Sequence, residues 1–157
     1  MQLAILVGSM TGTATSVAQA IQMDCADLVD TIALLPMDTL DPGVFDSEAG
    51  VPRLYLVCTS TFGSGDVPDN AQAFYASLDA DPRYLGHVRY GVVALGDQSY
   101  GATFTGGGSR FDERLQDLGA KRIGEICRLD AASGLQPESE AVAWCRGWLP
   151  QALAAAA

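Results

Sequence analysis

The stretch LAILVGSMTGTAT, residues 3–15, decides the fold. Its first five residues form a continuous apolar run, which is typical of a strand buried on both faces of a sheet. A short loop rich in glycine and hydroxyl groups follows, and a helix-like stretch runs from Thr15 to Met23. This order is suited to holding a phosphate, because the unpaired N–H groups of a helix's first turn face the anion and the helix dipole favours its charge.

The candidate phosphate loop differs from the familiar nucleotide-binding loops. It contains no lysine, and the spacing of Gly8 and Gly12 fits neither GxxxxGK(S/T) nor GxGxxG. Its hydroxyl groups supply hydrogen-bond donors without adding charge. On this turn alone two interpretations stay open: a phosphate site, or an ordinary strand–helix turn whose threonines cap the helix.

Composition places the chain among globular proteins of one domain. It has 157 residues, of which 48% are hydrophobic and 18% charged. No apolar run approaches the roughly 18–20 residues of a membrane span, and no basic segment precedes the first strand, so we expect a cytoplasmic protein that does not bind membranes. The net charge of −10 disfavours nucleic acid as a partner. It would instead attract a basic partner surface, or simply keep the protein soluble.

Four cysteines and one histidine limit the chemistry that the side chains can do. Cys25, Cys58, Cys127 and Cys145 are widely spaced with no CxxC pair, so we expect buried, reduced thiols. His87 alone offers little material for a catalytic triad or a histidine metal centre. Trp144 and Trp148, four residues apart on a predicted helix, indicate packing rather than function.

Strand and helix patterns alternate along the chain. The predicted strands are residues 3–8, 31–35, 54–58, 88–95 and 123–129. The predicted helices are residues 15–23, 70–78 (capped by Asp69), a stretch around 111–118 ended by Gly119, and 138–149, which ends at Pro150; residues 37–52 are expected to be loop with at most one short helix. Five strands with helical crossovers predict a single α/β domain over residues 1–157, with three layers around a parallel sheet.

Three loops should meet at the carboxyl ends of the strands, where open α/β sheets bind ligands. They are the candidate phosphate loop, residues 59–70 and residues 96–108. Phe62 and Tyr100 each follow a buried strand in a glycine-rich setting, which a flat ring stacked on them would explain. A phosphate anchor, two aromatic rings and backbone donors describe a flavin mononucleotide (FMN) pocket; the alternative is that both aromatics are packing residues.

The same loops carry a family resemblance. SMTGTA at residues 9–14 resembles the FMN phosphate loop of flavodoxins, and TSTFGSGDVPDN at 59–70 resembles the pattern TST-(F/Y/H)-G-x-G-(D/E)-x-PDN. ALGDQSY at 94–100 resembles the loop with the second stacking aromatic. The chain thus resembles the short-chain flavodoxins, most of all MioC-like flavodoxins and the flavodoxin-like domains of diflavin reductases. The resemblance implies a flavodoxin-like fold with strand order 2-1-3-4-5 and FMN as cofactor.

Carried over residue by residue, the resemblance implies a set of cofactor-binding residues. They are Ser9, Met10, Thr11, Gly12, Thr13, Ala14, Ser60, Thr61, Phe62, Gly63, Leu95, Gly96, Asp97, Tyr100, Thr103 and Phe104. Two departures from the family pattern affect this set. Ala14 stands where many flavodoxins have a hydroxyl, and the loop at 101–108 is one residue longer, which displaces Phe104 by one position.

The resemblance implies a monomeric one-electron carrier. FMN would cycle between semiquinone and hydroquinone, receiving electrons from a flavodoxin/ferredoxin reductase-type donor and passing them to an acceptor enzyme, both docked through basic surfaces. No acid–base pair or separate substrate pocket is evident, so we expect no catalytic residues and no metal. An FMN-dependent oxidoreductase such as a quinone reductase, or an accessory flavoprotein for one pathway enzyme, remain the alternatives. A response-regulator receiver is disfavoured, since carboxylates are missing where the first and third strands end.

Overall fold

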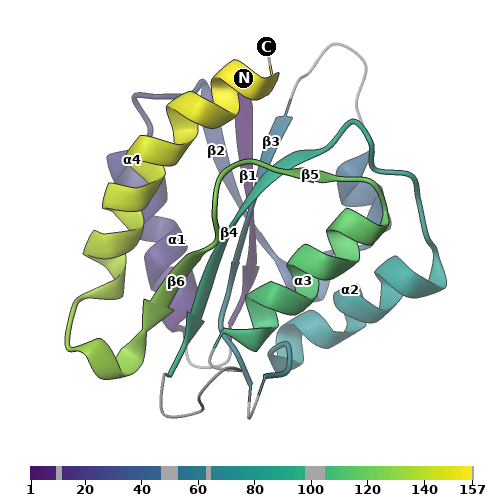
Figure 1. Ribbon diagram of the computed structural model, residues 1–157, viewed down its shortest axis with the longest axis horizontal. Coiled ribbons are helices and arrows are strands. Elements are labelled where there is room, and N and C mark those ends of the chain that lie inside the picture. Colours follow the sequence, from purple (N-terminus) through teal and green to yellow (C-terminus); the bar gives the residue numbers. More distant parts are fainter. Residues whose placement is uncertain (10–11, 47–52, 63–64, 98–104, 157) are drawn as a thin grey trace.

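One parallel sheet forms the centre of the molecule (Figure 1). The computed structural model describes residues 1–9, 12–46, 53–62, 65–97 and 105–156. Its strands are β1 (Gln2–Gly8), β2 (Thr31–Pro36), β3 (Arg53–Thr59), β4 (Arg89–Gly96), β5 (Lys121–Arg122) and β6 (Cys127–Asp130). Their order is β2-β1-β3-β4-β5, and β6 also pairs with β4. The predicted fold class and strand order are confirmed.

The predicted fifth strand is divided into two short segments. Both β5 and β6 lie beside β4, but residues 91–92 of β4 stand opposite residues 123–126, so the outer chain carries two extra residues there. Gly124 takes a positive φ of 71° within this excursion, a conformation that glycine adopts without steric cost. The strand predicted at 123–129 therefore overlaps only β6, because residues 123–126 form the excursion and β5 precedes the predicted start.

Helices cover both faces of the sheet, so the architecture has the predicted three layers (Figure 1). Helices α1 (Thr13–Asp24) and α4 (Pro137–Ala156) enclose one core with the sheet, while α2 (Asp69–Ala80) and α3 (Gly106–Asp117) enclose the other. Three short 3-10 helices complete the described elements: η1 (Met37–Thr39), η2 (Pro42–Phe45) and η4 (Ala131–Ser133). Two of these lie in the segment predicted as loop with at most one short helix.

Several predicted element ends need correction. Residues 106–108, predicted as part of the third loop, begin helix α3. Helix α1 begins at Thr13, two residues before the predicted start. Asp69 is the first residue of α2 rather than its cap, which is Pro68. Helix α4 does not end at Pro150 but continues to Ala156. Burial of Leu149 and Ala152 on both sides of the proline, together with the high helix propensity of the terminal alanines, offsets the proline's missing hydrogen bond.

The four cysteines and the two tryptophans are packing residues, as predicted. All four thiols are free and buried in the core between the sheet and helices α1 and α4. Burial raises the pKa of the Cys127 thiol to about 12, so it stays protonated at neutral pH. The Trp144 and Trp148 rings stack with centroids 5.4 Å apart, and the indole N–H of Trp148 donates to the Ile123 carbonyl at 2.8 Å.

The close contact between Gly91 and the Trp148 indole generates a stability prediction. A Cβ at Gly91 would lie 2.6 Å from two indole carbons, so Gly91→Ala should lower the free energy of unfolding by about 1–3 kcal/mol through overpacking. Urea denaturation measures this change. Gly147→Ala is the matched control, because nothing lies within 4 Å of its added Cβ inside α4. It should stabilise by about 0.5–1 kcal/mol; equal effects at both positions would contradict the packing account.

Candidate functional site

The ends of β1, β3 and β4 are tied together by hydrogen bonds at the carboxyl edge of the sheet. The backbone N–H of Ser60 donates to the Gly8 carbonyl at 2.9 Å, which joins the first two loops. The Thr61 hydroxyl donates to the Leu95 carbonyl at 2.9 Å, which joins the second loop to the end of β4. The structure therefore brings the described parts of the three predicted loops to one edge.

The first loop presents the N-terminus of α1 without a side-chain cap. Gly12 is the N-cap residue in the left-handed conformation, with φ of 89°, and it has no side chain with which to bond the helix. Its own N–H donates to Ser9 Oγ at 2.9 Å. Because that oxygen accepts this bond, the Ser9 hydroxyl keeps its proton to donate elsewhere. Thr13 and the buried Ala14 form the first turn, while Met10 and Thr11 lie outside the described residues.

This helix start bears on the two interpretations that the sequence left open. The capping residue is a glycine, so the described threonine Thr13 lies inside the helix rather than capping it. A helix N-terminus next to a hydroxyl donor is an arrangement that binds an anion. The geometry favours the phosphate interpretation.

The second loop holds an aromatic ring at the surface. Phe62 and Asp66 form an antiparallel bridge, with Phe62 N–H donating to Asp66 O at 2.8 Å and Asp66 N–H donating to Phe62 O at 2.9 Å. The Phe62 side chain is 43% exposed, although the residue follows a fully buried strand. Gly63 lies outside the described residues. A large apolar ring that the core does not use is available to stack on a ligand.

The N-terminus of α3 supports the second loop by close backbone contact, which sequence reasoning missed. A Cβ at Gly106 would lie 2.4 Å from the Gly65 carbonyl oxygen, and one at Gly107 equally close to that of Ser60. The Gly107 N–H also donates to Thr61 Oγ1 at 3.1 Å. Only glycine permits this approach, so the run of three glycines at 106–108 was the available signal.

Two arginines lie on the same side of the site. The Arg110 Nε–H donates to the Gly65 carbonyl at 2.7 Å, and its guanidinium lies 3.7 Å from the Asp66 carboxylate. Arg128 of β6 donates to the hydroxyl oxygens of Thr105 and Ser109. These cations, which the sequence analysis did not single out, hold the start of α3 against β6 and the second loop.

The third loop is described only at its beginning. Leu95, Gly96 and Asp97 lie at the end of β4, and Leu95 is buried. Tyr100, Thr103 and Phe104 lie outside the described residues, so the second stacking aromatic stays a prediction. Asp130, at the end of β6, accepts a hydrogen bond from Ala132 N–H at 2.9 Å and caps η4.

The described donors fit a phosphate ester attached to a flat ring. The Ser9 hydroxyl and the start of α1 offer neutral donors, and Phe62 offers a stacking face. Asp66, Asp69 and Asp97 place carboxylates at the same edge of the sheet. The edge therefore suits an anionic group bound by amides and hydroxyls rather than by lysine or arginine salt bridges.

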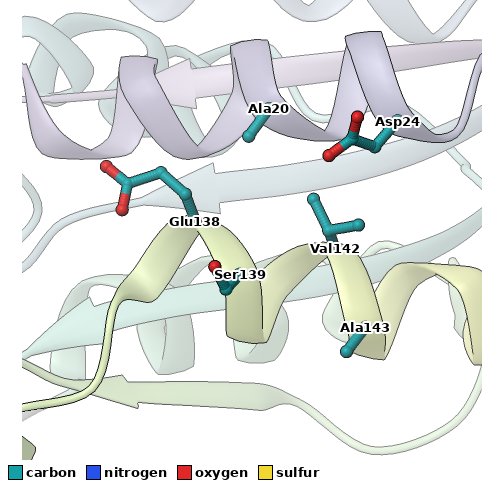
Figure 2. Close-up of a pocket in the computed structure, with 6 residues that line it drawn as sticks. All are labelled: Ala20, Asp24, Glu138, Ser139, Val142 and Ala143. Carbon is teal, nitrogen blue, oxygen red and sulfur yellow. The ribbon is translucent and has the colours of Figure 1, made fainter.

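A separate cavity of about 290 Å³ lies between α1 and α4 (Figure 2). It is lined by Ala20, Asp24, Glu138, Ser139, Val142 and Ala143. Figure 2 shows the Asp24 carboxylate coming from α1 and the Glu138 carboxylate from α4. None of the predicted site residues lines it, so this cavity belongs to the helix pair and not to the loop edge.

Comparison with known proteins identifies the family. A family model described as Flavodoxin matches residues 5–144. Flavodoxin YqcA of Pectobacterium carotovorum is 37% identical over 147 residues, covering 94% of this chain and 94% of that protein. The structure of a cysteine-to-alanine mutant of flavodoxin from Pseudomonas aeruginosa superposes with a TM-score of 0.82 at 36% identity, covering 98% and 99% of the two chains.

The two groups named from the sequence also match. Protein MioC of Escherichia coli is 34% identical over 96 residues, covering 61% of this chain and 65% of that protein. Methionine synthase reductase of Bos taurus is 38% identical over 95 residues, covering 59% of this chain and 13% of that protein. Together the fold and the loop edge define an electron-transfer flavoprotein. The chain belongs to the flavodoxin family, whose members bind FMN and carry electrons.

The exposed ring of Phe62 generates a binding prediction. Phe62→Ala should weaken FMN binding by about 1–3 kcal/mol, by analogy with aromatic stacking on nucleic-acid bases. The apoprotein should keep its stability within about 0.5 kcal/mol, because the ring contributes little to the core. Flavin fluorescence titration and urea denaturation measure the two quantities.

Tyr84 provides the control for this variant. Its side chain is 82% exposed. The residue precedes the amino end of β4 and so lies away from the loop edge. Tyr84→Ala should therefore leave FMN affinity unchanged. If Phe62→Ala bound FMN as tightly as the wild type, Phe62 would not be a stacking residue.

Proposed function

We propose that this protein is a one-electron carrier that accepts electrons from a flavodoxin/ferredoxin reductase-type donor and delivers them to a separate acceptor enzyme. The loop edge carries this proposal: an uncapped helix N-terminus beside β1 and an exposed aromatic ring beside β3, joined by the Ser60–Gly8 hydrogen bond. Bound FMN supplies the redox chemistry. The chain itself anchors the phosphate, stacks on the ring system and sets the local electrostatic potential.

The ligand set that we propose for FMN follows the loop edge. Ser9, Met10, Thr11, Gly12, Thr13 and Ala14 hold the phosphate, and Ser60, Thr61, Phe62, Gly63, Leu95, Gly96, Asp97, Tyr100, Thr103 and Phe104 surround the rest of the cofactor. The hydroxyl of Ser9 and the first-turn amides of α1 are the described phosphate donors.

Carboxylates at the loop edge support the carrier role. Asp66, Asp69 and Asp97 repel negative charge on the reduced cofactor, which disfavours the second reduction and makes the bound flavin a stronger one-electron reductant. A net charge of −10 also attracts a partner with a basic docking surface. We propose a monomer that works in the cytoplasm; among the described residues, no helix is long and apolar enough to cross a membrane.

A reconstituted electron-transfer assay tests the carrier function. The FMN-loaded protein with NADPH and a quinone should show no turnover beyond that of free FMN, because a carrier lacks its own nicotinamide and quinone sites. Adding a ferredoxin/flavodoxin reductase with a basic docking surface should start electron flow to cytochrome c. The rate should fall several-fold as salt rises from about 0.01 to 0.15 M, since the Debye length shrinks from about 30 to 8 Å.

Each arm of the assay can contradict the proposal. Quinone reduction without any reductase would favour the FMN-dependent oxidoreductase instead. A rate that does not change with salt would exclude docking by charge attraction. A chain that failed to retain FMN after reconstitution, judged by its visible absorption, would remove the carrier function.

A further inference from the structure

The amide side chain of Asn70 connects helix α2 to the phosphate loop. Asn70 is the only asparagine of the chain and the second residue of α2. Its Oδ1 accepts a hydrogen bond from the backbone N–H of Ser9 at 2.8 Å, across 61 residues of sequence. The two groups are partly buried. Without Asn70, water could satisfy the Ser9 N–H only in part, so loss of this hydrogen bond would cost free energy.

The Asn70–Ser9 bond continues into the start of α1. Ser9 Oγ accepts the hydrogen bond from Gly12 N–H, and Gly12 is the N-cap of α1. On the preceding residue, the Gly8 carbonyl accepts from Ser60 N–H, so the chain is held on both sides where it leaves β1. A two-bond path thus runs from Asn70 through Ser9 to the helix N-terminus that faces the anion.

The chemistry of residue 70 is unusual for its position in a helix. The first turn of a helix favours negative charge, and α2 already begins with Asp69. An aspartate at 70 would accept the same hydrogen bond and interact better with the helix dipole. A neutral amide there gives up that interaction but adds no charge beside a loop that must hold an anionic phosphate.

We propose that Asn70 is a positioning and specificity-determining residue for the phosphate of the flavin. It fixes Ser9 and, through it, the start of α1, and its neutrality keeps this acceptor from repelling a phosphate dianion. The inference rests on the FMN site proposed above and assigns Asn70 a role that acts through Ser9. It predicts that Asn70 matters more for FMN, which has a phosphate, than for riboflavin, which lacks one.

Asn70→Asp is the decisive variant. The carboxylate keeps the acceptor and suits the helix, so the apoprotein should be at least as stable as the wild type in urea denaturation. FMN affinity should fall roughly tenfold or more at low salt and recover towards the wild-type value near 1 M salt, where the screening length is about 3 Å. Riboflavin affinity should stay within about twofold of the wild-type value at both salt concentrations, as expected when a charge faces no phosphate. Fluorescence titration of the apoprotein measures both flavins.

Asn70→Ala tests the hydrogen bond itself. It leaves the Ser9 N–H without its acceptor, so FMN affinity should fall roughly tenfold at both salt concentrations, with a smaller loss for riboflavin. Gln72→Glu and Gln72→Ala are the matched controls, because Gln72 is exposed on the same helix. Both should bind the two flavins as the wild type does.

The outcomes separate this inference from the FMN site on which it rests. Normal FMN binding by the wild type together with an Asn70→Asp variant that matches it at low salt overturns the specificity role. Equal losses of FMN and riboflavin in Asn70→Ala overturn the positioning role and leave a general structural contact. A wild-type chain that binds neither flavin overturns the FMN site itself. Should Asn70→Ala fail to fold, the Asn70→Asp comparison decides alone.

Discussion

The hydrogen bond from Ser60 N–H to the Gly8 carbonyl is the interaction on which the site depends. It extends the pairing of β1 with β3 one step beyond the strands and so brings two loops from distant parts of the sequence into contact. A parallel sheet in which β1 lies directly beside β3 makes this possible, since crossover connections place the carboxyl ends of neighbouring strands at the same edge. Without this adjacency, the hydroxyls of the first loop and the aromatic ring of the second could not serve one ligand.

Close backbone contacts give the edge its shape. The β1 chain leaves the sheet at Gly8, where an added Cβ would lie 2.5 Å from the Thr59 hydroxyl oxygen. Helix α3 begins with glycines that touch the second loop, and Gly12 begins α1 with a positive φ. Each glycine lowers the stability of its helix or strand through conformational entropy. Burial of apolar side chains in the two cores, one on each side of the sheet, offsets this loss of stability.

Neutral hydrogen-bond donors and charged side chains occupy different parts of the loop edge. Neutral amides and hydroxyls gather at the start of α1, an arrangement suited to an anion. Carboxylates lie along the second and third loops, where we propose that they act on the electronic state of the bound ring. Arg110 and Arg128 bond to loop carbonyl and hydroxyl groups, so their positive charges hold the scaffold and leave the phosphate to neutral donors.

The sequence by itself determined the fold class and the family, and it predicted the sheet edge at which the site is proposed. An apolar run such as the one before Gly8 indicates burial on both faces of a sheet. The motif around Phe62 is local in the sequence. Both can therefore be recognised without knowing which distant residues are in contact. Only the tertiary structure decided where β5 ends and β6 begins, that α4 continues through Pro150, and that Asn70 bonds to Ser9. These features depend on which residues far apart in the chain become neighbours, and their energies come from burial and pairing that no local pattern records.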